Sequence, residues 1–400
     1  MNNETRKETQ VLPKDVRYVG ADDLTLPLFE NQYPVQPMGV SYNSYLILDE
    51  KIAVMDSVDA RAADEWLAKL AHELDGRSPD YLVISHMEPD HSGSILRLAE
   101  KYQEMKLVGN TKTFTMLRQF FGAKAPTDDR LLEVGEGETL PLGTHTLHFM
   151  LAPMVHWPEV MVAYEETEKL LFSADAFGRF GSLGRTANAP WAPQARRYYY
   201  NIVGKYGAQV QALLKKASAL EIKTVCPLHG PVLTGGALAE ALRLYDLWSR
   251  WQSESPDDIL LAHASIHGNT ARAAELLKQK LEAKGARVTL CDLTTTEVSY
   301  AVANAFYCGK LVLACSTYDG GLFPPMEEFL SHLQAKGFRD RSVGLMENGS
   351  WAPAAARLMR AKLEEMKDLR VCGTVVSLRS ALSPASEAQM DALTTELCAE

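Results

Sequence analysis

The sequence lacks several features that would place it in common functional classes. No Cys-x-x-Cys pair occurs among its 6 cysteines, which excludes a zinc ribbon or a rubredoxin-type iron site. No run of about 18 apolar residues occurs, so no transmembrane helix is predicted. The first residues, Met1 to Gln10, are polar and hold no apolar core for a signal peptide. The net charge of −10 argues against a nucleic-acid-binding protein. We therefore expect a cytoplasmic protein with neither nucleic acid nor membrane as a partner.

The chain has no internal repeat, but the pattern of predicted strands and helices changes at one polar, proline-containing seam, residues 251–258. Its 400 residues, 46% hydrophobic and 23% charged, predict a globular protein with two or three domains. Before the seam, many short strands alternate with few helices. After it, strands and helices alternate regularly, which is typical of a parallel doubly wound sheet. We expect domains at residues 1–253 and 257–400, with no third domain.

Apolar periodicity predicts the main elements of the first domain. A helix over about 60–74 would bury Ala63, Leu67, Leu70 and Leu74, and a second helix is predicted over about 236–251. Strands are predicted at 40–48, 52–56, 81–84, 106–108, 146–151, 169–173 and 224–226.

The loop after the strand at 81–84 is dense in possible metal ligands. It carries His86, Glu88, Asp90 and His91. Because a structural zinc is usually closed by four ligands, often thiolates, two imidazoles and two carboxylates from one loop favour a site with two metals. The alternative is a polar loop whose histidines only cap neighbouring elements.

Three later strand ends supply further donors, His156, Asp175 and His229. One such residue alone is usually structural. Together with the four loop residues, however, they make seven donors. Two metal ions could each take roughly three of these, and the remaining carboxylate could bridge the two ions.

In the second domain, a loop of small and hydroxyl residues follows the strand predicted at 259–262 and enters a helix. Such a loop is typical of a phosphate cradle, because backbone N–H groups and the helix dipole both favour an anion. It matches neither a Walker loop nor Gly-x-Gly-x-x-Gly, so a nucleoside triphosphate and NAD fit poorly. A plain helix cap is the alternative. The loop consists of Ser265, Ile266, His267, Gly268, Asn269 and Thr270.

Two more loops follow the strands predicted at 311–314 and 342–346. Both lie at strand C-terminal ends, where doubly wound sheets bind ligands. The three loops together resemble a flavodoxin-like FMN site, in which Tyr318 and Trp351 would pack on or beside the flavin ring. The two loops contain Ser316, Thr317, Tyr318, Asp319, Gly320 and Gly321, and Asn348, Gly349, Ser350 and Trp351.

The order of the metal donors resembles the metallo-β-lactamase-like fold, whose hydrolases typically carry His-x-His-x-Asp-His. This chain has Glu88 in place of the second histidine, as in the flavodiiron proteins. The resemblance implies one iron bound by His86, Glu88 and His156, and another bound by Asp90, His91 and His229, with Asp175 bridging them.

The resemblance to flavodiiron proteins covers nearly the whole chain, although His267 stands where the family often has an aromatic residue or Met. It implies an N-terminal metallo-β-lactamase-like αββα sandwich followed by a flavodoxin-like doubly wound parallel sheet. It also implies reduction of O₂ to water and/or of NO to N₂O. Electrons would come from an external carrier such as rubredoxin and pass through FMN to two irons. A head-to-tail homodimer, or a dimer of such dimers, is implied as well.

The choice of metal separates two functions. Carboxylate oxygens suit iron, whereas zinc has no redox chemistry. A dinuclear zinc hydrolase with an accessory flavodoxin-like domain is the alternative, and Glu88 and the FMN loops argue against it.

The segment from Arg196 to Tyr200 resembles a family segment that approaches the diiron pocket. A hydroxyl of Tyr198 or Tyr199 could donate a hydrogen bond to a bound oxygen species. Packed aromatics at a helix start are the alternative. We expect Arg196 and Arg197 to be solvated.

Overall fold

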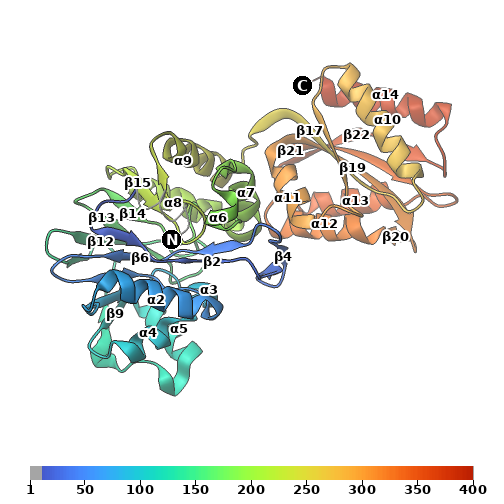
Figure 1. Ribbon diagram of the computed structural model, residues 1–400. Coiled ribbons are helices and arrows are strands. Elements are labelled where there is room, and N and C mark those ends of the chain that lie inside the picture. The colour runs from blue at the N-terminus through green and yellow to red at the C-terminus, as the bar shows by residue number, and fades with distance from the viewer. Residues whose placement is uncertain (1–10, 400) are drawn as a thin grey trace. The chain divides into compact units, whose positions relative to one another are not determined.

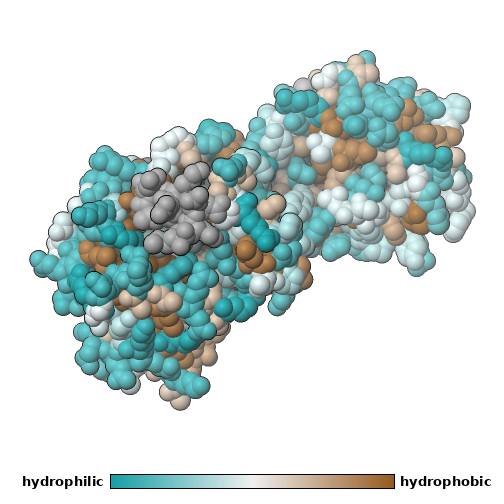
Figure 2. Space-filling view, viewed as in Figure 1, coloured by the Kyte–Doolittle hydropathy of each residue, from teal (hydrophilic) through white to brown (hydrophobic). Residues whose placement is uncertain are grey.

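The computed structural model describes residues 11–399, and the polar first ten residues, where no signal peptide is expected, lie outside this part. The chain divides into two compact units, Met1–Asp246 and Leu247–Glu400 (Figure 1). The division falls inside helix α9 (Gly235–Ser249), a few residues before the seam expected at 253–257. Among residues 11–399, no helix has the length and apolarity needed to cross a membrane. On the face in Figure 2, hydrophilic side chains predominate and apolar ones are dispersed.

The first unit is built on two six-stranded sheets. In the first, the order is β1 (Val16–Tyr18), β6 (Tyr45–Ile47), β7 (Ala53–Met55), β8 (Tyr81–Val83), β9 (Lys106–Gly109) and β10 (Leu131–Glu133). In the second, the order is β11 (Thr139–Pro141), β12 (Thr146–Leu151), β13 (Met161–Glu165), β14 (Leu170–Phe172), β15 (Thr224–Cys226) and β16 (Leu233–Thr234). Two short ladders join β2 (Ala21–Asp23) to β5 (Val40–Tyr42), and β3 (Leu28–Phe29) to β4 (Tyr33–Pro34).

The inner faces of the two sheets form one hydrophobic core. Met55 and Val83 of the first sheet and Phe149 and Phe172 of the second belong to it, and all four are buried. Burying each such side chain stabilises the fold by about 1.5–3 kcal/mol, which fixes the face that each strand turns inward.

Helices cover the outer faces of the sandwich. Figure 1 shows α2, α4 and α5 on one outer side and α8 and α9 on the other, which confirms the αββα arrangement. The helices of this unit before α9 are α2 (Ala63–Leu74), α3 (Pro89–Ser92), α4 (Ile95–Lys101), α5 (Thr111–Phe121), α6 (Leu183–Thr186), α7 (Trp191–Tyr198) and α8 (Gly207–Ala217).

Two details of the first unit differ from expectation. The single strand predicted over 40–48 is wrong, because the chain leaves β5 and enters β6 at Asn43 and Ser44. The Asn43 side-chain amide donates hydrogen bonds to the carbonyl oxygens of Pro227 (2.8 Å) and Gly230 (2.7 Å), on the loop that carries His229. In α2, Trp66 is buried while Leu67 is only half-buried, because the helix turns its aromatic residue to the sheet.

The second unit is a parallel sheet in the order β18 (Val288–Asp292), β17 (Ser255–Ala264), β19 (Cys308–Tyr318), β21 (Arg341–Asn348) and β22 (Leu369–Leu378). A short strand, β20 (Gly321–Leu322), pairs antiparallel with β19. This order is that of flavodoxin-like sheets and confirms the predicted class. Figure 1 shows α10 (Asn269–Ala283) and α14 (Pro384–Cys398) on one face, and α11 (Val298–Tyr307), α12 (Pro324–Ala335) and α13 (Ala355–Glu364) on the other.

Strand β17 begins at Ser255, earlier than the predicted start at Ile259. Its pairing with β19 shifts register between these two residues. Gly309 lies against the irregularity, and a Cβ there would meet the Pro256 carbonyl oxygen at 2.0 Å. The proline-containing end of the expected seam is therefore already part of the sheet.

A buried histidine links carboxylates from both sheets of the first unit. His145 is 1% exposed and lies between Glu165 at the end of β13 (Nδ1–Oε1 3.0 Å) and Asp15 just before β1 (Nε2–Oδ2 2.9 Å). Its backbone N–H donates to Asp49 Oδ2 at 2.7 Å. The hydrogen bond with Glu165, opposed by burial and aided by Asp15, raises the pKa of His145 to about 9.

We expect His145→Gln to remove a pH-dependent part of the unfolding free energy. Because the pKa is raised in the folded state, the stabilisation is complete below the unfolded pKa near 6.5 and is lost as the pH rises through about 9. The wild type should therefore lose about 1–3 kcal/mol more than the variant between pH 7 and pH 10, measured by urea unfolding.

The matched control is His148→Gln on β12, whose pair with Glu166 is exposed. It should change stability by less than about 1 kcal/mol at either pH. Equal pH dependence in the wild type and His145→Gln would contradict the assignment.

Candidate metal centre

Four strand ends bring the predicted metal donors to one place in the first unit. His86 and Glu88 lie in the loop after β8, and Asp90 and His91 lie in the short helix α3, which begins at Pro89. Proline suits this first helical position because its missing N–H would have no partner there. The other donors, His156, Asp175 and His229, follow β12, β14 and β15.

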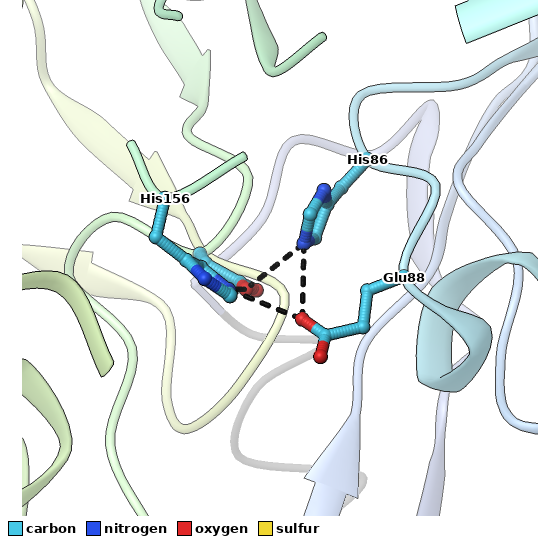
Figure 3. A group of neighbouring side chains, drawn as sticks. His86, Glu88 and His156 are labelled. Atoms are coloured by element: carbon cyan, nitrogen blue, oxygen red, sulfur yellow. Dashed lines mark hydrogen bonds and ion pairs between the residues drawn. The ribbon is translucent and has the colours of Figure 1, made fainter. Parts of the chain in front are cut away.

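The first set of donors consists of His86, Glu88, His156 and Asp175 (Figure 3). Glu88 Oε2 lies 3.2 Å from His86 Nε2 and 3.1 Å from His156 Nε2. Asp175 Oδ2 lies 3.1 Å from His156 Nε2 and 3.6 Å from His86 Nε2. One ligand atom from each residue lies within 4.8 Å of the others, so a single ion could contact all four.

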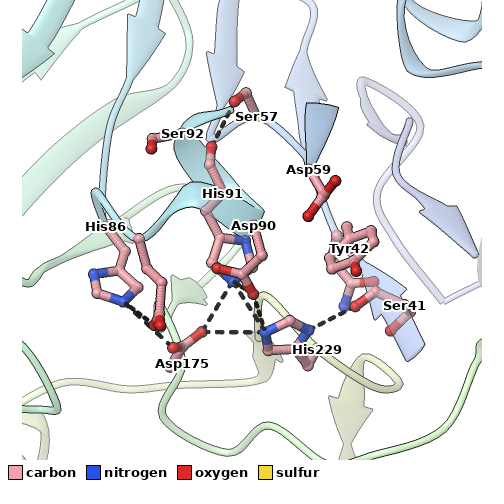
Figure 4. Close-up of polar contacts among 12 residues, drawn as sticks. Ser41, Tyr42, Ser57, Asp59, His86, Asp90, His91, Ser92, Asp175 and His229 are labelled. Carbon is pink, nitrogen blue, oxygen red and sulfur yellow. Dashed lines mark hydrogen bonds and ion pairs between the residues drawn. The ribbon is translucent and has the colours of Figure 1, made fainter. Parts of the chain in front are cut away.

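The second set consists of Asp90, His91 and His229 (Figure 4). The Nε2 atoms of His91 and His229 are 3.0 Å apart, and Asp90 Oδ2 lies 3.2 Å from each. Asp175 Oδ1 lies 3.3 Å from His91 Nε2 and 3.7 Å from His229 Nε2. Asp175 thus turns one oxygen to each set, as a bridging carboxylate would.

The histidine hydrogen bonds show that these nitrogens suit a metal. His229 Nδ1 donates to the Ser41 carbonyl oxygen at 2.6 Å, and His86 Nδ1 donates to Glu159 Oε1 at 2.8 Å. Each bond places the proton on Nδ1, so the Nε2 lone pair points into the site, where it faces other acceptors. Such contacts are repulsive unless a proton or a metal ion lies between them, and outer partners of this kind typically orient metal-binding histidines.

The electrostatics of the site agree with this interpretation. Burial lowers the pKa of His91 and His156, but Asp90 and Asp175 around the first and Asp175 and Glu88 around the second raise them to about 10 and about 9. Burial favours a neutral Asp175, yet its hydrogen bonds with His156 and His91 hold its pKa well below the usual range. The carboxylates therefore stay ionised, and the imidazoles hold protons that a bound metal ion would displace.

Sequence reasoning missed the outer partners of the donors. Glu159 is buried, accepts a hydrogen bond from the backbone N–H of Met87 at 2.9 Å and holds His86 in place. Ser41 contributes only a carbonyl oxygen to His229. No motif marks either residue, because their roles arise from proximity in the fold.

The two candidate catalytic tyrosines occupy different surroundings. The ring of Tyr198 lies 5.5 Å from that of His229, and its buried hydroxyl has no hydrogen-bond partner among residues 11–399. Burial, followed by the charges of Asp175 and Asp90, raises its pKa well above normal. Tyr199 begins a π-helical turn, Tyr199–Val203, and packs against Tyr245 at 5.1 Å. The geometry brings Tyr198, rather than Tyr199, to the metal donors.

The expectation that both arginines of this segment are solvated is wrong for Arg197. Its guanidinium lies 4.8 Å from the centre of the Phe180 ring and donates to the Pro34 carbonyl oxygen at 2.8 Å. Arg196 is half-buried. The aromatic ring and the carbonyl oxygen compensate the charge of Arg197 in its buried position. No local sequence pattern predicts these contacts.

A separate cavity of about 480 Å³ lies at the C-terminal ends of β17, β19 and β21 in the second unit. It contains fourteen of the predicted flavin-site residues, together with Ala352 and Ser380, which sequence reasoning missed. The predicted residues in its wall are Ser265, Ile266, His267, Asn269, Thr270, Ser316, Thr317, Tyr318, Asp319, Gly320, Asn348, Gly349, Ser350 and Trp351. Gly268 instead precedes α10 with φ 87°, and Gly321 lies in β20.

The inner wall of this cavity is polar and its rim is aromatic. The hydroxyls of Thr270 and Ser316 are 2.8 Å apart, and the Asn348 amide nitrogen lies 3.3 Å from Thr270 Oγ1. Helix α10 begins here with no acidic residue in its first turn, so its N-terminus favours an anion. Trp351 is 88% exposed and Tyr318 is 44% exposed. These features fit a phosphate attached to a planar ring.

Comparisons with known proteins find relatives that cover most of the chain. The model of a family described as "ODP family beta lactamase" matches residues 40–230. The rubredoxin-oxygen oxidoreductase of Megalodesulfovibrio gigas is 27% identical over 362 residues, which cover 87% of each chain. A flavo-diiron protein of Clostridium acetobutylicum is 27% identical over 344 residues, covering 82% of this chain and 84% of that protein.

Solved structures extend the similarity to both units. The rubredoxin oxygen:oxidoreductase of Desulfovibrio gigas matches with a TM-score of 0.89 at 25% identity, covering 97% of each chain. At this coverage the match includes both units. The chain is therefore similar to flavodiiron proteins in sequence and in fold.

Proposed function

We propose that this protein is a diiron- and FMN-dependent reductase that converts O₂ to water, NO to N₂O, or both. The observation that carries the proposal is the position of Asp175, which turns one carboxylate oxygen to each of two donor sets. Relatives named rubredoxin-oxygen oxidoreductase and anaerobic nitric oxide reductase flavorubredoxin support this activity. They do not favour the zinc hydrolase alternative.

The donor chemistry fits two irons. His86, Glu88 and His156 would hold one, Asp90, His91 and His229 the other, and Asp175 would bridge them. When bound, the irons would supply the redox chemistry that zinc lacks. Carboxylate oxygens suit iron in its oxidised state, and Glu88 provides one where a further imidazole would favour zinc.

Side chains of this protein would orient the metal ligands and supply a proton to the substrate. Glu159 and Ser41 hold two imidazoles with Nε2 turned inward, so little rearrangement is needed to bind metal. The raised pKa of Tyr198 keeps a proton on its hydroxyl beside His229, where it can donate to a substrate oxygen. Tyr199 remains a weaker candidate for this role.

FMN would bind in the cavity of the second unit. The loop from Ser265 to Thr270 and the start of α10 would hold its phosphate, while Tyr318 and Trp351 would lie against the ring. The flavin would pass electrons from an external donor, rubredoxin or a similar carrier, to the metal centre.

The assembly and location belong to the same proposal. A head-to-tail homodimer, or a dimer of dimers, would place the flavin of one chain beside the metal centre of its partner. The 88% exposed Trp351 at the cavity rim supports a covering surface there. Five of the six cysteines are buried, as small apolar side chains are, and we propose the cytoplasm as the compartment. The proposed domains are residues 1–253 and 257–400, although β17 already begins at Ser255.

The purified protein is expected to contain two irons and one FMN per chain and to consume O₂, NO or both when reduced. Metal analysis, flavin absorbance and electrode assays with each gas measure this directly. Zinc without flavin, together with hydrolase activity, would support the alternative function instead.

Asp175→Ala should lower turnover by about 100-fold or more and reduce the iron content, because both donor sets lose their shared oxygen ligand. FMN content should stay unchanged, since the flavin cavity lies in the other unit. The matched control is Glu100→Ala at an exposed position of α4. Full turnover with normal iron in Asp175→Ala would contradict the bridging role.

Trp351→Ala should alter flavin fluorescence and slow flavin reduction, because an aromatic wall of the cavity is removed. Iron content should remain normal. Phe120→Ala serves as the control, because it also removes an exposed aromatic side chain but lies in the first unit, outside the cavity. Identical flavin spectra and reduction rates in Trp351→Ala and the wild type would remove Trp351 from the site.

A further inference from the structure

A second cavity of about 560 Å³ opens onto the metal centre from within the first unit. Two of the proposed ligands, Glu88 and Asp90, form part of its wall, so water in this cavity can reach the donors. The other residues of the wall come from the β3–β4 region, from β5, from the segment after β7 and from the start of α3. They are Leu26, Leu28, Phe29, Glu30 and Asn31, then Tyr42, then Asp59 and Arg61, and finally Pro89.

Most ionisable groups in this wall already have partners. Arg61 forms an ion pair with Asp59 at 2.9 Å and donates to the Tyr42 hydroxyl at 3.2 Å. Glu88 and Asp90 face the histidines of the two donor sets. The carboxylate of Glu30 differs, because within residues 11–399 no hydrogen bond or ion pair engages it. It is therefore available to exchange a proton with water in the cavity.

The backbone fixes Glu30 at this place. Glu30 and Asn31 have φ values of 50° and 53° and form the turn between β3 and β4, closed by a hydrogen bond from Gln32 N–H to the Phe29 carbonyl oxygen at 3.0 Å. Such turns favour Asn, Asp or Gly, so a glutamate here is costly for the turn itself. Phe29 attaches the turn to the metal centre, since its ring meets that of His229 edge-on at 5.3 Å.

We propose that Glu30 is a proton relay, which takes protons from bulk water and passes them through water in this cavity to the substrate at the metal centre. This inference rests on the proposed reductase function. Reduction of one O₂ to two waters consumes four electrons and four protons. Reduction of two NO to N₂O and one water consumes two of each. The electrons come from the external donor, and Glu30 returns to its ionised form after each transfer by taking another proton from solvent.

The ionisation behaviour of Glu30 agrees with this role. Glu30 is an exposed residue, but partial loss of water around its carboxyl and the negative charge of Glu88 raise its pKa to about 7, against an opposing effect of His156. A relay works best when its pKa lies near the working pH, because both protonation states are then populated. The role of Tyr198 is different, since its raised pKa holds a proton beside the substrate without ready exchange with solvent.

The test compares the iron- and FMN-loaded wild type with the variants Glu30→Gln and Glu30→Asp. Glu100→Gln, which removes an exposed carboxylate on α4, is the matched control. Glu30→Gln should lower kcat by about 100-fold, leave KM nearly unchanged and remove an ionisation near pH 7 from the kcat profile. Glu30→Asp should recover most of the rate, and Glu100→Gln should match the wild type. Iron and FMN contents should be equal in all four proteins.

A second measurement does not depend on turnover. Infrared difference spectra of the loaded wild type should show a carboxyl group that takes up a proton close to pH 7, and this signal should vanish in Glu30→Gln. Wild-type kcat and an unchanged pH profile in Glu30→Gln, or the same infrared signal in that variant, would overturn the relay. An iron-loaded wild type that reduces neither gas would instead contradict the proposed function, while the infrared comparison would still report on Glu30.

Discussion

The carboxylate of Asp175 lies between two groups of candidate metal donors and turns one oxygen to each, which is the constraint that the surrounding structure has to hold. Several buried carboxylates this close to one another repel, and burying each charge costs several kcal/mol unless opposite charge is near. The imidazoles provide part of that compensation and bound cations would provide the rest. The folded sandwich must therefore hold these donors against their own repulsion, and its large core between two sheets supplies the stability that this requires.

The chain holds the donors rigidly by fixing the groups behind them. Glu159 and Ser41 orient His86 and His229, and Asn43 attaches the break between β5 and β6 to the loop of His229. Phe29 and Tyr198 both pack against His229 and against each other. The same contacts position the turn of Glu30 and the hydroxyl of Tyr198, so metal binding and proton supply depend on one packed cluster.

The second unit forms its cavity from loops at the ends of parallel strands, without a cluster of buried charges among the residues that line it. Its sheet reverses strand order beside β17, and the loops that leave β17, β19 and β21 meet around one cavity. Hydroxyl and amide groups line its inner wall, whereas the rim leaves Trp351 exposed. The proposed redox chemistry would thus be divided between a site built from charged side chains and a site built from polar loops and aromatic faces.

The sequence by itself predicted the two folds, and it named the seven residues that lie together in the first unit and most of those that line the cavity of the second, because they occur in short, dense motifs such as His86 to His91 and beside regular apolar periodicity. It could not determine the split of the strand at 40–48, the burial of Arg197 or the distinction between Tyr198 and Tyr199. Those depend on which segments, distant in sequence, come into contact. Only the tertiary structure decided that Glu159 stands behind His86 and that Glu30 lines a cavity beside Glu88, since a carboxylate acquires such a role from its neighbours in space.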